Sequence, residues 1–400
     1  MKDLKELKKL LILSLSLSTL FGSGFDYLSK ENQGELNIQK EINSLSSKNL
    51  KLNWIEPIVA SFSYSKNNQL SSWKKTRYFK VSLNQPIFKS GGIYFAIKYA
   101  NANKKFKSLA TSLQQNALIR RLYELTLELK KLDIQIKQTK LNIKNTNLDI
   151  KRKKERFLSG DDDISFLNQA LLKKNNLLLT LNDLKTKHTE LENSFKNISN
   201  YSYKEITLPK LTLVTKEEFF KRNLELKKQK QSLKQTNQLK NMTISNFLPT
   251  ISLIADYNYI KTKVANTNWQ KSKYKNYGVV VSIPFSLNES REIEIKKLEV
   301  LKEKLSLKQK QRDLKSEYQT ILAKEQNLKN RLLIINQNIK LYNSLIKTTK
   351  NALLAGDKTK DDLQTLKNTK QSLLYDLTKT KYDIEINLLK LFEKMDIHEI

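Results

Sequence analysis

The chain contains no cysteine and only two histidines, and this scarcity removes several classes of chemistry. Without thiols there can be no disulfides, no thiolate metal sites and no cysteine nucleophile. We expect His188 to be an exposed helical residue and His398 to lie in a frayed C-terminus, neither with a ligand partner. The chain also lacks the G-x-x-x-x-G-K-S/T loop that binds nucleotide phosphates. We therefore expect no catalysis, no cofactor and no metal centre.

Long apolar runs are also scarce, and the one near the N-terminus is too short to cross a bilayer comfortably. Residues 10–21 are apolar except for serines and one threonine, with Lys8 and Lys9 before them and small residues after them. This pattern predicts a cleaved export signal at residues 1–24, and an amphipathic first helix is the alternative. No later run approaches the roughly 20 residues of a membrane-spanning helix. Any membrane crossing would therefore have to be made of strands.

Acidic residues are few beside basic ones, with 40 Asp and Glu against 73 Lys and Arg, for a formal net charge of +33. Such an excess raises the question of nucleic acid. The positive charge is mostly lysine, however, spread along helical segments and mixed with Glu and Asp. This distribution favours a solvated surface, and we expect no nucleic acid partner. A soluble basic coiled-coil scaffold or a nucleic-acid-binding protein stays open as the alternative class of function.

Four segments alternate apolar and polar residues with the period of two that is typical of strands. They are expected at residues 54–66, 77–88, 247–260 and 274–286, as two hairpins. Strands of outer membrane barrels alternate in this way, with apolar residues toward lipid and polar residues toward the lumen. A half-buried sheet in a soluble protein would alternate in the same way.

Glycine and proline are rare, with eight and five residues, and two long stretches have helical spacing. At residues 92–157 and 288–354, apolar residues recur at steps of three and four, which is the heptad pattern of a coiled coil. The first of these helices would be about 100 Å long. Gly160 and Gly356 follow their ends, and acidic residues suited to a helix N-terminus come next. The other expected helices are return helices at 164–197 and 360–394, a short one near 36–52, and one at 215–244 that begins with a capping box.

The second half of the chain repeats the first. Gly356 lies 196 positions after Gly160, and the prolines that bracket the second hairpin follow those of the first at offsets of 192 and 198. Such agreement indicates two internal structural repeats, at residues 25–208 and 209–400.

Taken together, these features resemble the TolC-type outer membrane channels of efflux and secretion systems. The resemblance depends on the repeated order of hairpin, long helix and return helix, and on two helix turns. These turns are ERFLSGDDDISFLNQALLKKN around Gly160 and LLAGDKTKDDLQTL around Gly356.

The resemblance implies an α+β membrane protein. Each chain would give four antiparallel strands to a shared barrel in a homotrimer and helices to a coiled-coil tunnel, the α-barrel, in the periplasm. It implies an exit duct of a tripartite efflux pump, with a periplasmic adaptor and an inner-membrane pump as partners, or alternatively a type I protein secretion system.

The resemblance also implies roles for individual residues. Lys358, Asp361 and Asp362 in the second turn would form the constriction that closes the tunnel, and Asp161, Asp162 and Asp163 supply an acidic cluster in the first. If three chains meet there, these carboxylates would form a ring that holds cations and raises the pKa of its members. The residues expected to face lipid are Phe62, Tyr64, Val81, Leu83, Ile251, Leu253, Val279 and Val281. Those expected to face the pore are Thr250, Ser252, Asp256, Asn258, Gly278 and Ser282.

Overall fold

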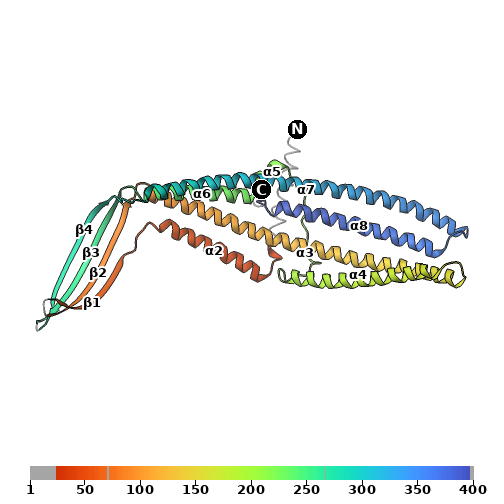
Figure 1. The fold of residues 1–400 in the computed structure, drawn as a ribbon, viewed down its shortest axis with the longest axis horizontal. Helices are drawn as coiled ribbons and strands as arrows, with labels where there is room; N and C mark the ends of the chain where they lie inside the picture. The colour runs from red at the N-terminus through yellow and green to blue at the C-terminus, as the bar shows by residue number, and fades with distance from the viewer. Residues whose placement is uncertain (1–23, 70–71, 266, 397–400) are drawn as a thin grey trace. The chain divides into compact units, whose positions relative to one another are not determined.

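The computed structural model describes residues 24–69, 72–265 and 267–396 of the chain. His398 and nearly all of the expected export signal at residues 1–24 lie outside the described residues. Long helices and one four-stranded sheet make up the fold (Figure 1). In chain order the elements are α2 (Lys30–Leu52), β1 (Val59–Gln69), β2 (Ser72–Phe88), α3 (Gly92–Leu158), α4 (Ile164–Lys196), α5 (Lys216–Arg222), α6 (Leu224–Ser245), β3 (Thr250–Val264), β4 (Gln270–Ser282), α7 (Glu289–Leu354) and α8 (Lys360–Phe392).

The described chain divides into two compact units, and each takes segments from both halves of the sequence. The sheet unit consists of residues 38–111 and 225–311, and the helical unit of the remaining segments. The two expected repeats therefore do not correspond to the two units. Both long helices contribute residues to each unit, which explains why the units interleave along the chain.

The sheet has the strand order β1-β2-β3-β4, and every neighbouring pair is antiparallel. The two predicted hairpins thus join through β2 and β3, whose register runs from Lys74 opposite Val264 to Phe88 opposite Ile251, with an irregularity after Pro86. A proline cannot donate to the ladder, which accounts for a bulge at this place. Among the described residues, β1 and β4 each pair along one edge only.

Most of α2, together with α6 and the neighbouring parts of α3 and α7, completes the sheet unit. Asn43 of α2 donates its side-chain amide to Thr111 Oγ1 of α3 at 2.9 Å. Gln229 of α6 donates to Glu303 of α7 at 2.8 Å. The chain turns from β2 into α3 through Gly91, whose φ of +84° is a conformation that favours glycine.

The core of the helical unit lies along the predicted heptad seam of α3. Leu122, Leu125 and Leu129 are fully buried, and the two threonines of the seam, Thr139 and Thr146, are buried as well. Fully burying a leucine contributes about 1.5–3 kcal/mol, so each of these three leucines stabilises the unit. None of the helices in the described ranges is both long and apolar enough to span a membrane.

The single helix expected at residues 215–244 is instead divided into α5 and α6. Thr215 caps α5 by accepting a hydrogen bond from the Glu218 N–H at 3.2 Å. The helix then breaks at Asn223, because the backbone there forms a bridge with Met395 and the next N–H donates to the Lys394 carbonyl at 2.7 Å. These bonds come from the C-terminal end of the chain and override the local helical preference.

Candidate functional site

The two helix turns that the sequence singled out have the same backbone design. Gly160 has φ of +82° and Gly356 has φ of +87°, and each follows the end of a long helix. In each turn, the N–H of the residue after the glycine donates to a carbonyl near the end of the long helix. The Asp161 N–H donates to the Arg156 carbonyl and the Asp357 N–H to the Ala352 carbonyl, both at 2.9 Å. This geometry closes a helix C-terminus through a left-handed glycine. The sequence signal for the two turns therefore has a direct structural cause.

The three aspartates of the first turn have three separate local partners. Asp161 Oδ2 accepts from the Ser159 hydroxyl at 2.8 Å, and Asp162 Oδ1 lies 2.9 Å from Arg156 Nη2. Asp163 caps α4 by accepting from the Ser165 N–H at 2.7 Å. Across the described residues, no group of three or more His, Asp or Glu side chains is arranged to hold a metal ion. Within one chain, these carboxylates thus stabilise the turn.

The second turn carries a capping box. Thr359 accepts from the Asp362 N–H at 3.1 Å, and the Asp362 carboxylate accepts from the Thr359 N–H at 3.1 Å. Asp361 lies in a looser ion pair with Lys151 of α3, at 3.8 Å. Lys358, the basic residue that the resemblance implied for this site, is exposed in the turn.

Asp362 instead has a basic partner on another helix. Arg152 Nη1 of α3 donates to Asp362 Oδ1 of α8 at 3.1 Å, which connects the last part of α3 to the start of α8 within one chain. Sequence reasoning missed Arg152, although its position continues a heptad of polar α3 residues. The members of this heptad meet polar α8 residues in the pairs Lys131–Asp383, Gln138–Asp376, Asn145–Asn368 and Arg152–Asp362.

In each turn, hydrogen bonds favour the charged form of one carboxylate. Those from the Thr359 backbone and side chain lower the pKa of Asp362, and the charges of Arg152 and Lys358 act in the same direction. Hydrogen bonds from Ser165 lower the pKa of Asp163. An acidic ring would raise the pKa of its carboxylates, whereas the contacts within one chain lower the pKa of Asp163 and Asp362. Such a ring would therefore have to form between neighbouring chains.

The two faces of the sheet differ in polarity. Cross-strand pairs such as Phe62–Phe79, Val81–Tyr257 and Leu253–Val279 place all eight residues predicted to face lipid on one face. The opposite face carries the predicted pore residues. There Lys80 forms an ion pair with Asp256 at 3.1 Å, and the Tyr78 hydroxyl donates to Asn258. The sheet therefore presents one polar face and one face that carries most of its apolar residues.

His188 is not the exposed residue that the sequence predicted. Its side chain is 19% exposed, and its Nε2 lies 3.2 Å from Asp133 Oδ1 of α3. The Tyr203 hydroxyl donates to the other oxygen of the same carboxylate at 2.8 Å. Burial and the hydrogen bond to Asp133 raise the pKa of Tyr203. This cluster fastens the end of α4 and the segment after it to α3, a contact that helical spacing alone does not reveal.

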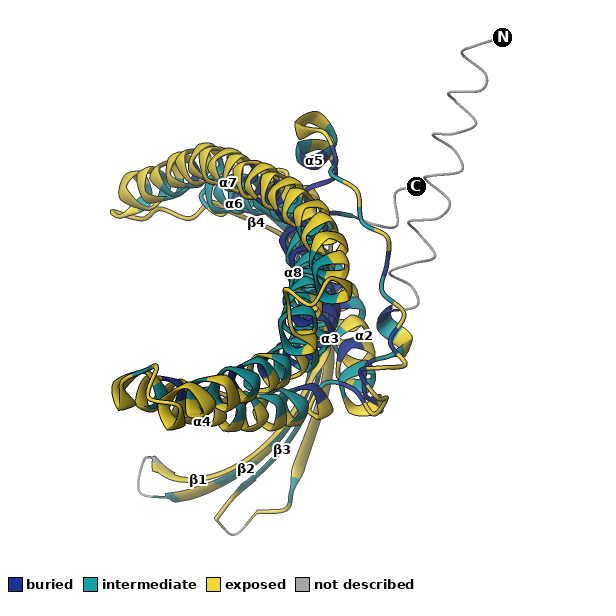
Figure 2. Ribbon diagram, turned by 90° about the vertical axis from the view of Figure 1, so that its right-hand side faces the viewer, coloured by how far each residue is buried: buried dark blue, intermediate teal, exposed yellow. Residues whose placement is uncertain are grey.

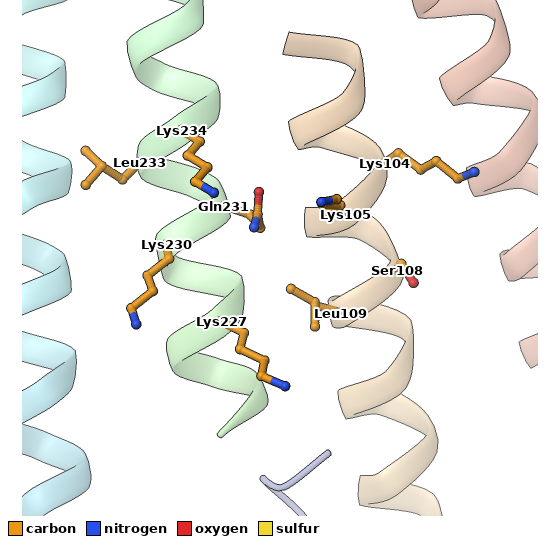
Figure 3. Close-up of a pocket in the computed structure, with 9 residues that line it drawn as sticks. All are labelled: Lys104, Lys105, Ser108, Leu109, Lys227, Lys230, Gln231, Leu233 and Lys234. Carbon is orange, nitrogen blue, oxygen red and sulfur yellow. The ribbon is translucent and has the colours of Figure 1, made fainter. Parts of the chain in front are cut away.

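A lysine-lined pocket of about 640 Å³ lies between α3 and α6 in the sheet unit. Figure 3 shows its lysine side chains spreading from both helices, with Gln231 and Leu109 between them. The lysines are Lys104 and Lys105 of α3 and Lys227, Lys230 and Lys234 of α6. No acidic residue lines the pocket, so its potential is positive.

Comparison with solved structures connects these elements to a known architecture. The CmeC outer membrane channel of Campylobacter jejuni superposes with a TM-score of 0.74 at 13% sequence identity, over 96% of this chain and 87% of that one. The outer membrane protein VceC of Vibrio cholerae gives 0.72 at 12% identity, over 95% and 96% of the two chains. The chain has the TolC-type channel fold. The open-state MtrE outer membrane channel of Neisseria gonorrhoeae agrees, with a TM-score of 0.71 at 12% identity over 94% and 89%.

The predicted TolC-type resemblance is thus confirmed at the level of the fold, including the helical part and the four-stranded antiparallel sheet. No protein-family model and no curated protein matches the sequence. The fold is recognised from the arrangement of helices and strands, since fewer than one residue in seven is identical.

Proposed function

We propose that the chain is an outer membrane channel that works as a homotrimer, a passive exit duct for small toxic compounds across the periplasm and the outer membrane. The observation that carries this proposal is the sheet, which is apolar on one face, polar on the other, and open along both outer edges. Backbone groups at an open edge cannot be left unpaired in lipid. Three copies would close β4 of each chain onto β1 of the next, in one twelve-stranded barrel.

The helices support the same assembly. Helices α4 and α7 are largely exposed along their length (Figure 2). A number of their apolar residues are exposed too, with Leu178 of α4 at 44% and Leu333 of α7 at 62%. Exposed apolar stripes of this kind mark surfaces for protein contacts. In the proposed trimer, α4 of one chain packs against α7 of the next and completes the wall of the tunnel.

The tunnel would span the periplasm and receive its cargo through a periplasmic adaptor from an inner-membrane pump. In this arrangement the energy comes from the pump, and the chain contributes a path. The two helix turns would lie at the end that meets the adaptor, and the Arg152–Asp362 pair would help to keep this end closed.

Cysteine labelling tests the barrel directly, because the natural chain has no cysteine to interfere. Asn276→Cys and Val279→Cys place a thiol on the polar and the apolar face of the same strand. In outer membrane vesicles, a water-soluble maleimide should label Asn276→Cys and spare Val279→Cys. A lipid-borne quencher should affect a fluorophore at Val279→Cys only. Equal labelling of both positions, or recovery of a water-soluble monomer from the cytoplasm, would refute the proposal.

A further inference from the structure

The strands carry an unusual imbalance of charge. They hold ten basic residues, one in β1, four in β2, two in β3 and three in β4, whereas Asp256 is the sole acidic residue in either hairpin. Eight of the ten lie on the face that bears the apolar residues, and Lys74 and Lys80 lie on the polar face. The ion pair of Asp256 is with Lys80, on the polar face. The eight basic residues of the apolar face therefore have no carboxylate within the strands.

Six of these residues form two neighbouring rows across the sheet. Lys66 of β1 lies opposite Lys75 of β2, which lies opposite Lys263 of β3. In the next row, Arg77, Lys261 and Lys271 are paired in the same way. Like charges directly opposite each other on adjacent strands are destabilising. Two such rows together indicate that the face meets anions when the protein is in its working environment.

The rows begin where a membrane span would end. Along β3, the apolar face runs from Ile251 to Tyr259, nine residues, before Lys261 begins the basic part, whereas on β4 the basic part begins at Lys275, opposite Tyr257. A transmembrane strand needs about 9–11 residues. The basic rows would therefore lie at the lipid headgroups, at the end of the sheet away from the helices.

Aromatic side chains accompany the basic ones, as at a membrane interface. Lys66 Nζ lies 4.2 Å from the centre of the Trp73 ring, and the Arg77 guanidinium lies 4.7 Å from that of Trp269. Lys66, Trp73, Lys75 and Lys263 also line a cavity of about 280 Å³. A water molecule takes up about 30 Å³, so the cavity has room for a phosphate group.

We propose that these two rows, here called the basic girdle, bind phosphate groups of anionic lipids in the outer leaflet of the membrane. The inference depends on the proposed barrel, which turns the apolar face toward lipid. The position favours lipid phosphate over free phosphate, because a site for a soluble anion is expected on the water-facing side of the strands. Lipid phosphates would offset the repulsion within each row and hold the barrel at a fixed depth.

The test compares two variants of the purified full-length trimer in detergent. Lys66→Gln/Lys75→Gln/Lys263→Gln removes one row of the girdle, whereas Lys74→Gln removes a neighbouring lysine from the opposite face. Diphosphorylated lipid A, dephosphorylated lipid A and inorganic phosphate are the three probes, and bound lipid is counted by native mass spectrometry. A lysine near an anionic surface contributes about a fivefold gain in binding. We expect the row variant to bind diphosphorylated lipid A roughly a hundredfold more weakly, and Lys74→Gln to bind it as the natural chain does.

The heat resistance of the trimer is a second readout, and the order of the two proteins should reverse when anionic lipid is added. Without anionic lipid, the row variant should be the more heat-resistant trimer, because the repulsion within the row is gone. With diphosphorylated lipid A, the natural trimer should be the more resistant. If the row variant fails to assemble, Arg77→Gln/Lys261→Gln/Lys271→Gln replaces it.

The possible failures are distinguishable. A trimer that inserts and conducts, yet binds lipid A equally with and without the row or regardless of its phosphates, would overturn the basic girdle and leave the channel standing. Protection by inorganic phosphate alone would also overturn it, in favour of a soluble anion. A chain that forms no trimer and enters no bilayer would overturn both proposals together.

Discussion

Replacing Arg152 with alanine should loosen the closed end of the proposed tunnel while leaving the turn itself intact. Arg152 is the α3 partner of Asp362, at 3.1 Å, and its side chain is 55% exposed. Asp362 keeps its capping box with Thr359 in the variant, so α8 still begins at the same place. The substitution therefore removes the connection between α3 and the start of α8, together with the ion pair that Arg152 forms with Asp149 on α3 itself, at 3.0 Å.

The expected size of the effect follows from the exposure of the pair. An exposed ion pair contributes about 0.2–1 kcal/mol. Three pairs in a trimer then contribute roughly 0.6–3 kcal/mol to the closed state, which corresponds to a change of about threefold to about 150-fold in the ratio of open to closed channels. Single-channel recording in planar bilayers measures this ratio directly.

Lys358→Ala is the matched control. The resemblance assigned the basic role to Lys358, whereas the structure pairs Asp362 with Arg152. We expect Lys358→Ala to conduct as the natural channel does. The effects of Arg152→Ala and Asp362→Ala on channel opening should be non-additive in the double variant, because both remove the same ion pair. Opening by Lys358→Ala together with unchanged conductance in Arg152→Ala would refute the reasoning.

The pH dependence of the pair adds an independent check. Because the pKa of Asp362 is lowered in the folded chain, its contribution is complete above the unfolded value of about 3.9. This contribution is lost as pH falls through the folded pKa. The fraction of open channels should therefore stay constant between pH 8 and pH 5, and it should rise only in stronger acid, where Asp362 becomes protonated.

Three further predictions concern other parts of the helical unit. Alanine at all three positions 161–163 should raise cation leakage in bilayers, and an unchanged block by cations would refute the hypothesis of an acidic ring. Leu178→Asp should abolish the heat-resistant trimer on gels, whereas Thr180→Asp, on another side of α4, should not; equal effects would argue against an interface along Leu178. Burial raises the pKa of Glu385 against the opposing charge of Lys130, so the free energy of unfolding should fall as pH rises from about 4.5 through the raised pKa. Glu385→Gln should lack that fall in urea titrations, and an unchanged pH profile would contradict it.

Sequence patterns predict elements here because each element is built on local periodicity. The heptads of α3 mark Leu122, Leu125 and Leu129, which the structure buries, and a left-handed backbone is needed at both Gly160 and Gly356. Alternation along the strands separates the two faces in the same way. These signals involve residues close in sequence, and each has a single physical cause.

What the sequence did not reveal depends on partners far along the chain. The break at Asn223 needs Met395, and the position of Arg152 needs Asp362. Joining of the two hairpins requires β2 to find β3, and periodicity carries no information on which strands become neighbours. Exposed ion pairs contribute little to stability, so no strong sequence pattern identifies which charged residues will pair.

The interleaving of the two units has a consequence for how the chain is made. Neither unit can be completed until the second half of the sequence has been synthesised, since α3 must find partners such as Met395, 279 residues away. Contacts of such long range make folding slow, because the loops between them must close first. A chain that has only its first half therefore cannot complete either unit.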